Sequence, residues 1–173
     1  MLVPNSQPVF TTVAGSRLYG MSHDDSDYDT FTVVTGRRRK GRHHVNGDQD
    51  RVVVTLPRFL DLVTSGSHQS VEALFSPYKE WNPQYESLRP FLESYRITGP
   101  EVFAKYERTI KSFCYGDFKR RRHAVRLMWG LSQLRDRGFL VPVLRPQEVE
   151  YATILAETLE GEELWTLLIT QEV

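Results

Sequence analysis

The sequence predicts an α+β fold in which a small N-terminal β-sheet is followed by a helical remainder. Three short runs rich in β-branched residues fall within the first third of the chain, and the apolar residues after them recur at helical spacing. The chain has 173 residues, which suits one domain or one small domain with a helical extension. Its 40% hydrophobic and 25% charged residues are ordinary for a soluble globular protein.

The three expected strands are bounded by glycine and polar residues. They cover residues 9–13, 28–34 and 51–55. Residues 36–50, between the second and third strands, read GRRRKGRHHVNGDQD and show no apolar periodicity. We expect this segment to be a mobile basic loop.

Helical signals begin with a short stretch at residues 17–21 and dominate the chain after the third strand. Pro57 suits a first helical turn, and Gly66 and Gly138 are expected to end helices. Asp117 is expected to cap a helix start. The apolar spacing places the later helices near residues 57–65, 71–75, 88–95, 100–113, 118–137, 146–159 and 162–169.

Charge and cysteine content narrow the function classes. The formal net charge is zero, so only local clustering of charge could indicate a nucleic-acid partner. Cys114 is the single cysteine, which fits a reducing compartment, and we expect it in the core. The start MLVPNSQPVF lacks the pattern of a signal peptide, and no apolar stretch approaches the roughly 18–20 residues that span a bilayer. A cytoplasmic protein without a membrane partner is therefore expected.

Residues 14–29, AGSRLYGMSHDDSDYD, carry the strongest chemical signal. Gly15 and Ser16 lie between a strand and a short helix, where backbone N–H groups bind phosphate and glycine allows it to come close. Asp27 and Asp29 are two residues apart as the second strand begins, so we expect both side chains on one face. Two such carboxylates repel each other without a cation, and together with substrate phosphates they are typical Mg²⁺ ligands.

The order of a strand, Gly-Ser, a short spacer and Asp-x-Asp resembles the signature of the DNA polymerase beta superfamily of nucleotidyltransferases. GSRLYGMSHDDSDYD is similar to a bacterial and phage group associated with RNA ligases, as are LPRFLDLVTSGSHQSVEALFSP and KRRRHAVRL. The similarity runs from Val9 to about Leu144. It implies a nucleotidyltransferase-type small mixed β-sheet with flanking helices and a helical C-terminal part. Residues 1–80 would form the catalytic core, and residues 81–173 a helical region packed on it.

The resemblance also implies a mechanism in which Mg²⁺ or Mn²⁺ is held by Asp27, Asp29 and a third carboxylate. An acceptor hydroxyl would attack the α-phosphate of a nucleoside triphosphate, and pyrophosphate would leave. Asp48 and Asp50 have the same strand parity, so parity cannot choose between them as the third carboxylate. We favour Asp50, which is closer to the strand and would help to deprotonate the hydroxyl.

Basic residues are the candidates for contact with the substrates. Beside Gly15 and Ser16, the expected nucleotide-binding residues are Arg17, Lys119, Arg122 and His123. The helix face that carries the last three, together with Arg126, could equally be an ordinary solvated face. A similar choice between an acceptor-binding cluster and a solvated loop applies to Arg37, Arg38, Arg39, Lys40 and Arg42.

The sequence thus predicts a nucleotidyltransferase that uses a nucleoside triphosphate, with RNA, such as a tRNA end, as the favoured acceptor. One alternative is transfer to a protein hydroxyl, as in the nucleotidyltransferases of toxin–antitoxin pairs. Another is a catalytically silent module that binds nucleotide or RNA, although such a module needs no converging carboxylates. Glu72, which is acidic amid apolar residues, is expected to pair with a buried arginine. Nucleotide preference and oligomeric state stay open.

Overall fold

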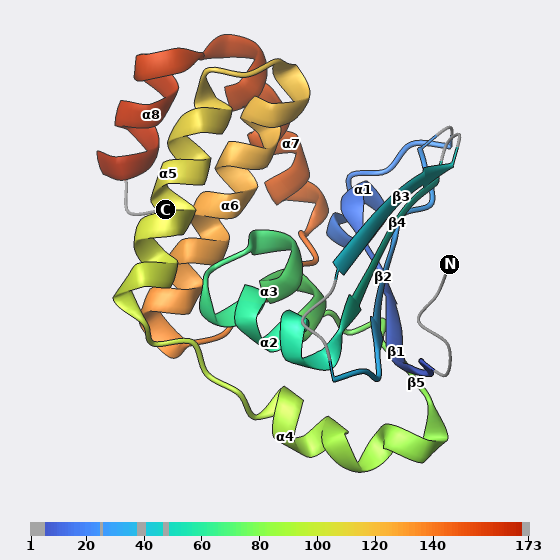
Figure 1. Cartoon of the computed structure of the whole chain (residues 1–173). Coiled ribbons are helices and arrows are strands. Elements are labelled where there is room, and N and C mark those ends of the chain that lie inside the picture. The colour runs from blue at the N-terminus through green and yellow to red at the C-terminus, as the bar shows by residue number, and fades with distance from the viewer. Residues whose placement is uncertain (1–5, 25, 38–40, 47–48, 171–173) are drawn as a thin grey trace.

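A computed structural model describes residues 6–24, 26–37, 41–46 and 49–170. Helices α5 to α8 lie to one side of a β-sheet, and α2 and α3 lie between the sheet and these helices (Figure 1). In the described part, five strands are hydrogen-bonded in the order β3-β4-β2-β1-β5. Their bounds are β1 Pro8–Val13, β2 Thr30–Val34, β3 Gly41–Asn46, β4 Gln49–Thr55 and β5 Glu80–Trp81. The α+β fold with a small mixed sheet and flanking helices is confirmed.

Strands β2 and β4 pair in parallel, whereas the other described pairings are antiparallel. Parallel neighbours need a crossover of about a dozen residues or more. Here the crossover takes residues 35–48 and contains β3, which folds back antiparallel onto β4 at the edge of the sheet. The prediction of a loop over residues 36–50 is therefore wrong. Edge strand β3 is defined by backbone pairing with β4, and its sequence carries no apolar alternation that could reveal it.

The strand boundaries near the expected carboxylates also differ from the prediction. Strand β2 begins at Thr30, so Asp27 and Asp29 precede it instead of lying two apart within it. Strand β4 begins at Gln49, which places Asp50 inside the strand. The Asp-Ser-Asp run before β2 favours turn conformations, and this delays the start of regular pairing.

The helices agree closely with the apolar spacing, and their ends lie where the sequence marks them. Helix α6 is capped by Asp117, whose Oδ1 accepts a hydrogen bond from the backbone N–H of Arg120 (2.9 Å), and Gly138 ends it at a φ of 74°. None of the helices in the part of the chain described above is long and apolar enough to cross a membrane. The helix bounds are α1 Gly15–Tyr19, α2 Leu56–Thr64, α3 His68–Phe75, the 3-10 helix η1 Pro83–Leu88, α4 Arg89–Glu93, α5 Pro100–Cys114, α6 Phe118–Arg137, α7 Pro146–Thr158 and α8 Gly161–Thr170.

One apolar core joins the sheet to the helices. Phe10 of β1 and Phe31 of β2 pack edge-on against Phe59 of α2, with ring centroids 5.6 and 5.9 Å apart. The same cluster continues through α3 into α5 and α6, where Cys114 is fully buried as expected. The sheet face that packs on α2 is therefore fixed to the helical part by continuous apolar contact.

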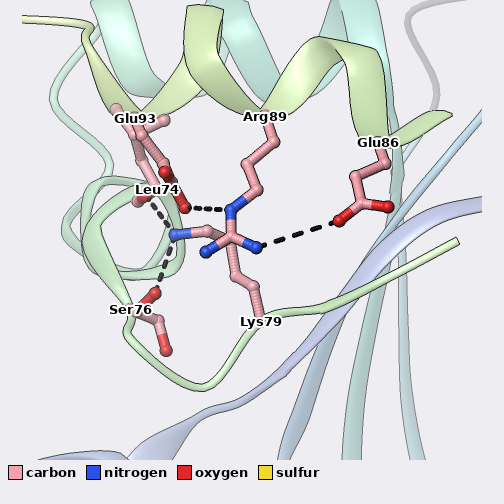
Figure 2. A network of polar contacts seen from close by, with 6 residues as sticks. All are labelled: Leu74, Ser76, Lys79, Glu86, Arg89 and Glu93. Atoms are coloured by element: carbon pink, nitrogen blue, oxygen red, sulfur yellow. Dashed lines mark hydrogen bonds and ion pairs between the residues drawn. The ribbon is translucent and has the colours of Figure 1, made fainter. Parts of the chain in front are cut away.

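The segment that leaves α3 is held by a separate group of polar contacts (Figure 2). The ammonium of Lys79 donates to the carbonyl oxygens of Leu74 (2.8 Å) and Ser76 (2.7 Å), at the end of α3. A cation is favourable there because it meets the negative end of the helix dipole. Nearby, Arg89 Nε donates to Glu93 Oε1 (2.8 Å) within α4, while Glu86 lies 4.0 Å from the same guanidinium.

The Asp117 cap generates a stability prediction. Asp117→Ala should lower the free energy of unfolding by about 1 kcal/mol, because a backbone N–H at the start of α6 loses its acceptor. The melting temperature should fall by roughly 2–4 °C. Asp117→Asn keeps an accepting oxygen and should behave like the unaltered protein. Equal melting temperatures for the two variants in calorimetry would show that the cap contributes nothing.

Candidate active site at the start of two parallel strands

Asp29 and Asp50 lie side by side at the start of neighbouring parallel strands. Thr30 of β2 is paired with Arg51 of β4, so the residues just before them, Asp29 and Asp50, lie at the same level. The backbone N–H of Asp50 donates to Oδ1 of Asp29 (3.2 Å). Residues at matched positions of adjacent strands point to the same face, so the register brings these two carboxyl groups together.

The two carboxyl groups line one cavity of about 60 Å³. Its wall also includes Gly15 and Tyr19 of α1 and the buried Glu72 of α3. Asp27 does not line the cavity, and its side chain is exposed. The structure therefore gathers Gly15, Asp29 and Asp50, as expected, while Asp27 lies outside at the surface.

The electrostatic surroundings of Asp29 are strongly negative. Its pKa is raised above the ordinary value, first by burial and then by the charges of Asp50 and Asp27, while the Asp50 N–H and the charge of Lys119 act in the opposite direction. Asp29 therefore carries its negative charge at a cost that a nearby cation would reduce. Lys119, at the start of α6, is therefore close enough to the site to act on the Asp29 carboxylate.

Gly15 touches Asp29 so closely that no side chain fits. A Cβ at position 15 would lie 2.2 Å from Oδ2 of Asp29, and Gly15 has a φ of 63°, which favours glycine. The Ala14 N–H donates to the backbone carbonyl of Asp29 (2.9 Å), so the turn is held to the backbone of Asp29. Ser16 is the second residue of α1, and its carbonyl accepts from Met21 N–H (2.9 Å).

Arg17 braces the chain before β2. Its guanidinium donates to the carbonyl oxygens of Ser26 (2.7 Å) and Asp27 (3.2 Å) and lies over the ring of Tyr28, 5.6 Å from the centroid. These contacts fix the approach to Asp29. The sequence predicted that Arg17 binds phosphate, but in the structure its guanidinium holds the loop before β2.

The basic residues of α6 differ in how far their side chains are buried. Lys119 is exposed, and Arg122 extends toward α1, with its guanidinium 3.5 Å from the Met21 carbonyl and over the ring of Phe118. Arg126, in contrast, is only 6% exposed. Of the two interpretations left open for this face, the solvated one is wrong for Arg126, because a buried carboxylate on α3 offers this arginine a partner inside the protein.

That partner is Glu72, so the expected pairing of Glu72 with a buried arginine is confirmed. Arg126 donates to Oε1 of Glu72, and the hydroxyl of Tyr19 donates to Oε2 (2.6 Å). The Arg126 guanidinium also lies 3.5 Å above the centroid of the Tyr19 ring. Sequence reasoning missed Tyr19, because a tyrosine at the end of a short helix gives no signal of a polar partner far along the chain.

His123 completes this group as a neutral side chain. Its Nδ1 accepts a hydrogen bond from Nε of Arg126 (3.3 Å), and its ring lies edge-on to that of Tyr19, with centroids 5.6 Å apart. Burial, and then the charges of Arg126, Arg122 and Lys119, lower the pKa of His123 to about 3. Because Nδ1 accepts a hydrogen bond, the neutral ring carries its proton on Nε2.

The expected acceptor-binding cluster is only partly described. Arg37 is exposed beyond the C-terminal end of β2, and Arg42 lies on β3 opposite Val53. Asp29 precedes the other end of β2, so the strand separates Arg37 from it by roughly 17 Å. Arg37 therefore does not adjoin the two carboxyl groups. Four of the candidate residues lie outside the described part of the chain: Arg38, Arg39, Lys40 and Asp48.

Asp29 and Asp50 are the candidate metal ligands in the cavity. Among the described residues, no group of three or more His, Cys, Asp and Glu side chains is gathered closely enough to hold a metal ion. Two carboxylates with substrate phosphates are nevertheless a usual way to hold Mg²⁺, and Asp29 and Asp50 supply such a pair of hard oxygen donors. The pair therefore fits a cation that arrives together with a triphosphate.

Comparison of the chain with protein-family models and with curated proteins finds no match. The fold and the geometry of the cavity therefore carry the functional argument.

The contact of Gly15 with Asp29 generates a prediction with an internal control. Gly15→Ala and Gly20→Ala both place a Cβ at a positive φ, which costs about 1 kcal/mol. At Gly20 the nearest atom outside the local chain would be 3.5 Å away, whereas at Gly15 the Asp29 carboxylate must move. Gly15→Ala should therefore unfold at a lower denaturant concentration than Gly20→Ala. Identical midpoints would contradict the contact.

The pKa of His123 generates a second prediction. The folded protein holds this pKa near 3, whereas in an unfolded chain it is about 6.5. Below about pH 6.5 the unfolded state therefore takes up a proton that the folded state refuses, and stability falls by up to about 1.4 kcal/mol per pH unit. His123→Asn should reduce this slope between pH 6.5 and 4.5 in urea unfolding. Some slope should remain, because burial also lowers the pKa of His68. An unchanged slope would contradict the assignment.

Proposed function

We propose that the protein is a metal-dependent nucleotidyltransferase of the DNA polymerase beta type. It would transfer a nucleoside monophosphate from a nucleoside triphosphate to an acceptor hydroxyl, with release of pyrophosphate. The observation that carries the proposal is the placement of Asp29 and Asp50 side by side in one cavity, against a glycine turn that follows a strand. Clustered carboxylates beside a glycine turn suit phosphoryl chemistry.

The roles of the residues follow from their positions. Asp29 and Asp50 would hold Mg²⁺ or Mn²⁺ together with the triphosphate, with exposed Asp27 available at the mouth of the site. When bound, the cation supplies positive charge that polarises the phosphoryl group. Asp50 would accept the proton of the attacking hydroxyl. Asp50 is held for this task by the strand, because β4 pairs with β2 on one side and β3 on the other.

The triphosphate would lie between α1 and the start of α6. Gly15 allows a phosphate to approach the backbone, and Ser16 adds a hydroxyl donor. Lys119 is exposed and close enough to influence Asp29, and Arg122 reaches the residues that follow α1. From the helical part, these two cations would attract the β- and γ-phosphates of the bound triphosphate.

The acceptor that we propose is RNA. Arg42 lies on edge strand β3, which pairs with the strand that carries Asp50, and exposed Arg37 lies farther along the same sheet. Basic residues in the segment that links β2 to β4 could contact a chain of phosphates, and such contacts require an acceptor that is long and negatively charged.

The direct test is incubation of the protein with each α-labelled nucleoside triphosphate, Mg²⁺ and total cellular RNA, with total cellular protein in parallel reactions. Label transferred to RNA would support the proposal, and label on protein would identify a protein hydroxyl as the acceptor instead. Absence of label in every reaction, under conditions in which the protein is folded, would contradict nucleotidyl transfer.

Asp50 provides the sharpest prediction. Asp50→Asn should lower the single-turnover rate of transfer at saturating triphosphate by at least ~10²-fold, which is the low end for loss of a general base. Triphosphate binding should largely survive, because Asp29, Lys119 and Arg122 are retained. Asp24→Asn makes the same substitution at an exposed loop carboxylate and should leave the rate unchanged. Equal rates for the two variants would remove Asp50 from the mechanism.

A further inference from the structure

We propose that Glu72 and Arg126 act through Tyr19 as a positioning unit that holds α1 against the site and thereby sets the affinity for the triphosphate. This inference rests on the proposed function, because it deepens the account of the same site. Tyr19, Glu72 and Arg126 come from α1, α3 and α6, so the unit joins three elements that are far apart in the sequence.

Helix α1 needs such support because it cannot hold its own position. It contains five residues, far fewer than the roughly 12–15 that an isolated helix needs for even marginal stability. Its apolar residue Leu18 packs in a small cluster with Tyr19 and Met21, separate from the main core. Apolar packing of this kind has little directional preference, so it fixes the distance of α1 from its neighbours better than its orientation.

Tyr19 fixes the orientation of α1 through three different side-chain contacts. Its hydroxyl donates to Glu72 (2.6 Å), the Arg126 guanidinium covers one face of its ring, and His123 meets the ring edge-on. Its backbone carbonyl accepts from Leu144 N–H (3.1 Å), on the segment that leads to α7. A ring held at its hydroxyl, face and edge has one orientation, and the backbone of α1 is fixed with it.

Glu72 can serve two helices at once because its two carboxylate oxygens have different partners. Oε1 accepts from Arg126 of α6, and Oε2 accepts from Tyr19 of α1. Glu72 is 2% exposed, and a buried ion pair stabilises a fold little compared with apolar residues of the same size. Such a pair is directional, however, and Glu72 lines the same cavity as Gly15 and Asp29. The geometry of the Glu72–Arg126 pair therefore affects the position of α1 at this cavity.

The test uses Tyr19→Phe, which removes the hydroxyl and keeps the ring under Arg126. Tyr106→Phe is the matched control. Tyr106 is equally buried and lines a cavity with Glu72 and Arg126, but its hydroxyl has no hydrogen-bond partner among the described residues. Three measurements compare both variants with the unaltered protein: amide hydrogen exchange of residues 15–21 without nucleotide, the Kd for non-hydrolysable triphosphates with Mg²⁺, and the single-turnover rate at saturating triphosphate.

We expect Tyr19→Phe to speed exchange in residues 15–21 and to weaken triphosphate binding by about 10-fold, because a hydrogen bond to a charged group is lost. The single-turnover rate should stay close to normal, since Asp29 and Asp50 are untouched. Tyr106→Phe should match the unaltered protein in all three measurements. Affinity that is unchanged in Tyr19→Phe would overturn the proposal, even if the melting temperature falls, because Tyr19 would then be structural only.

The two proposals fail in different ways. If the unaltered protein binds none of the four nucleoside triphosphate analogues, the proposed function is wrong, and with it the link from Tyr19 to affinity. Exchange in residues 15–21 would still decide whether Tyr19 holds α1. If the unaltered protein binds a triphosphate and Tyr19→Phe behaves like Tyr106→Phe, the positioning unit is wrong and the proposed function stands.

Discussion

The parallel pairing of β2 with β4 is the constraint on which the site depends. Its register sets Asp29 beside Asp50, and a shift of one residue would send one of the two side chains to the opposite face of the sheet. The pairing is possible because residues 35–48 give the chain enough length to return to the same end of the sheet. The pairing of the two carboxyl groups in one cavity and the position of Asp50 both follow from this one register.

A second level of organisation connects that sheet to the helices. The apolar core fixes how far α3 and α6 lie from the sheet, but it does not determine the orientation of α1, which packs in its own small cluster. The orientation of α1 is set by buried polar contacts, because Glu72 accepts hydrogen bonds from both Arg126 and Tyr19. The helical region after residue 81 is thereby connected to the cavity through Arg126 and Glu72, and its Lys119 lowers the pKa of Asp29.

The sequence predicted the local structure well wherever the signal lies within one element. Apolar spacing placed the helices, and Asp117 and Gly138 marked the ends of α6. It failed at β3, because that edge strand exists through pairing with β4, and at Arg126, because helical spacing cannot show that a carboxylate from α3 meets it inside the core. The proximity of Asp29 and Asp50 was expected from a resemblance. The register that produces it, and the part played by Tyr19, needed coordinates.

The contact between Gly15 and Asp29 also has an evolutionary consequence. Because Oδ2 of Asp29 occupies the space of a side chain at position 15, a residue larger than glycine there requires the Asp29 carboxylate to move. A descendant that acquires a larger residue at position 15 must relocate or replace the carboxylate, and so gives up the arrangement on which the cavity depends. A homologue with a residue larger than glycine at position 15 should therefore also show a displaced or altered side chain at position 29.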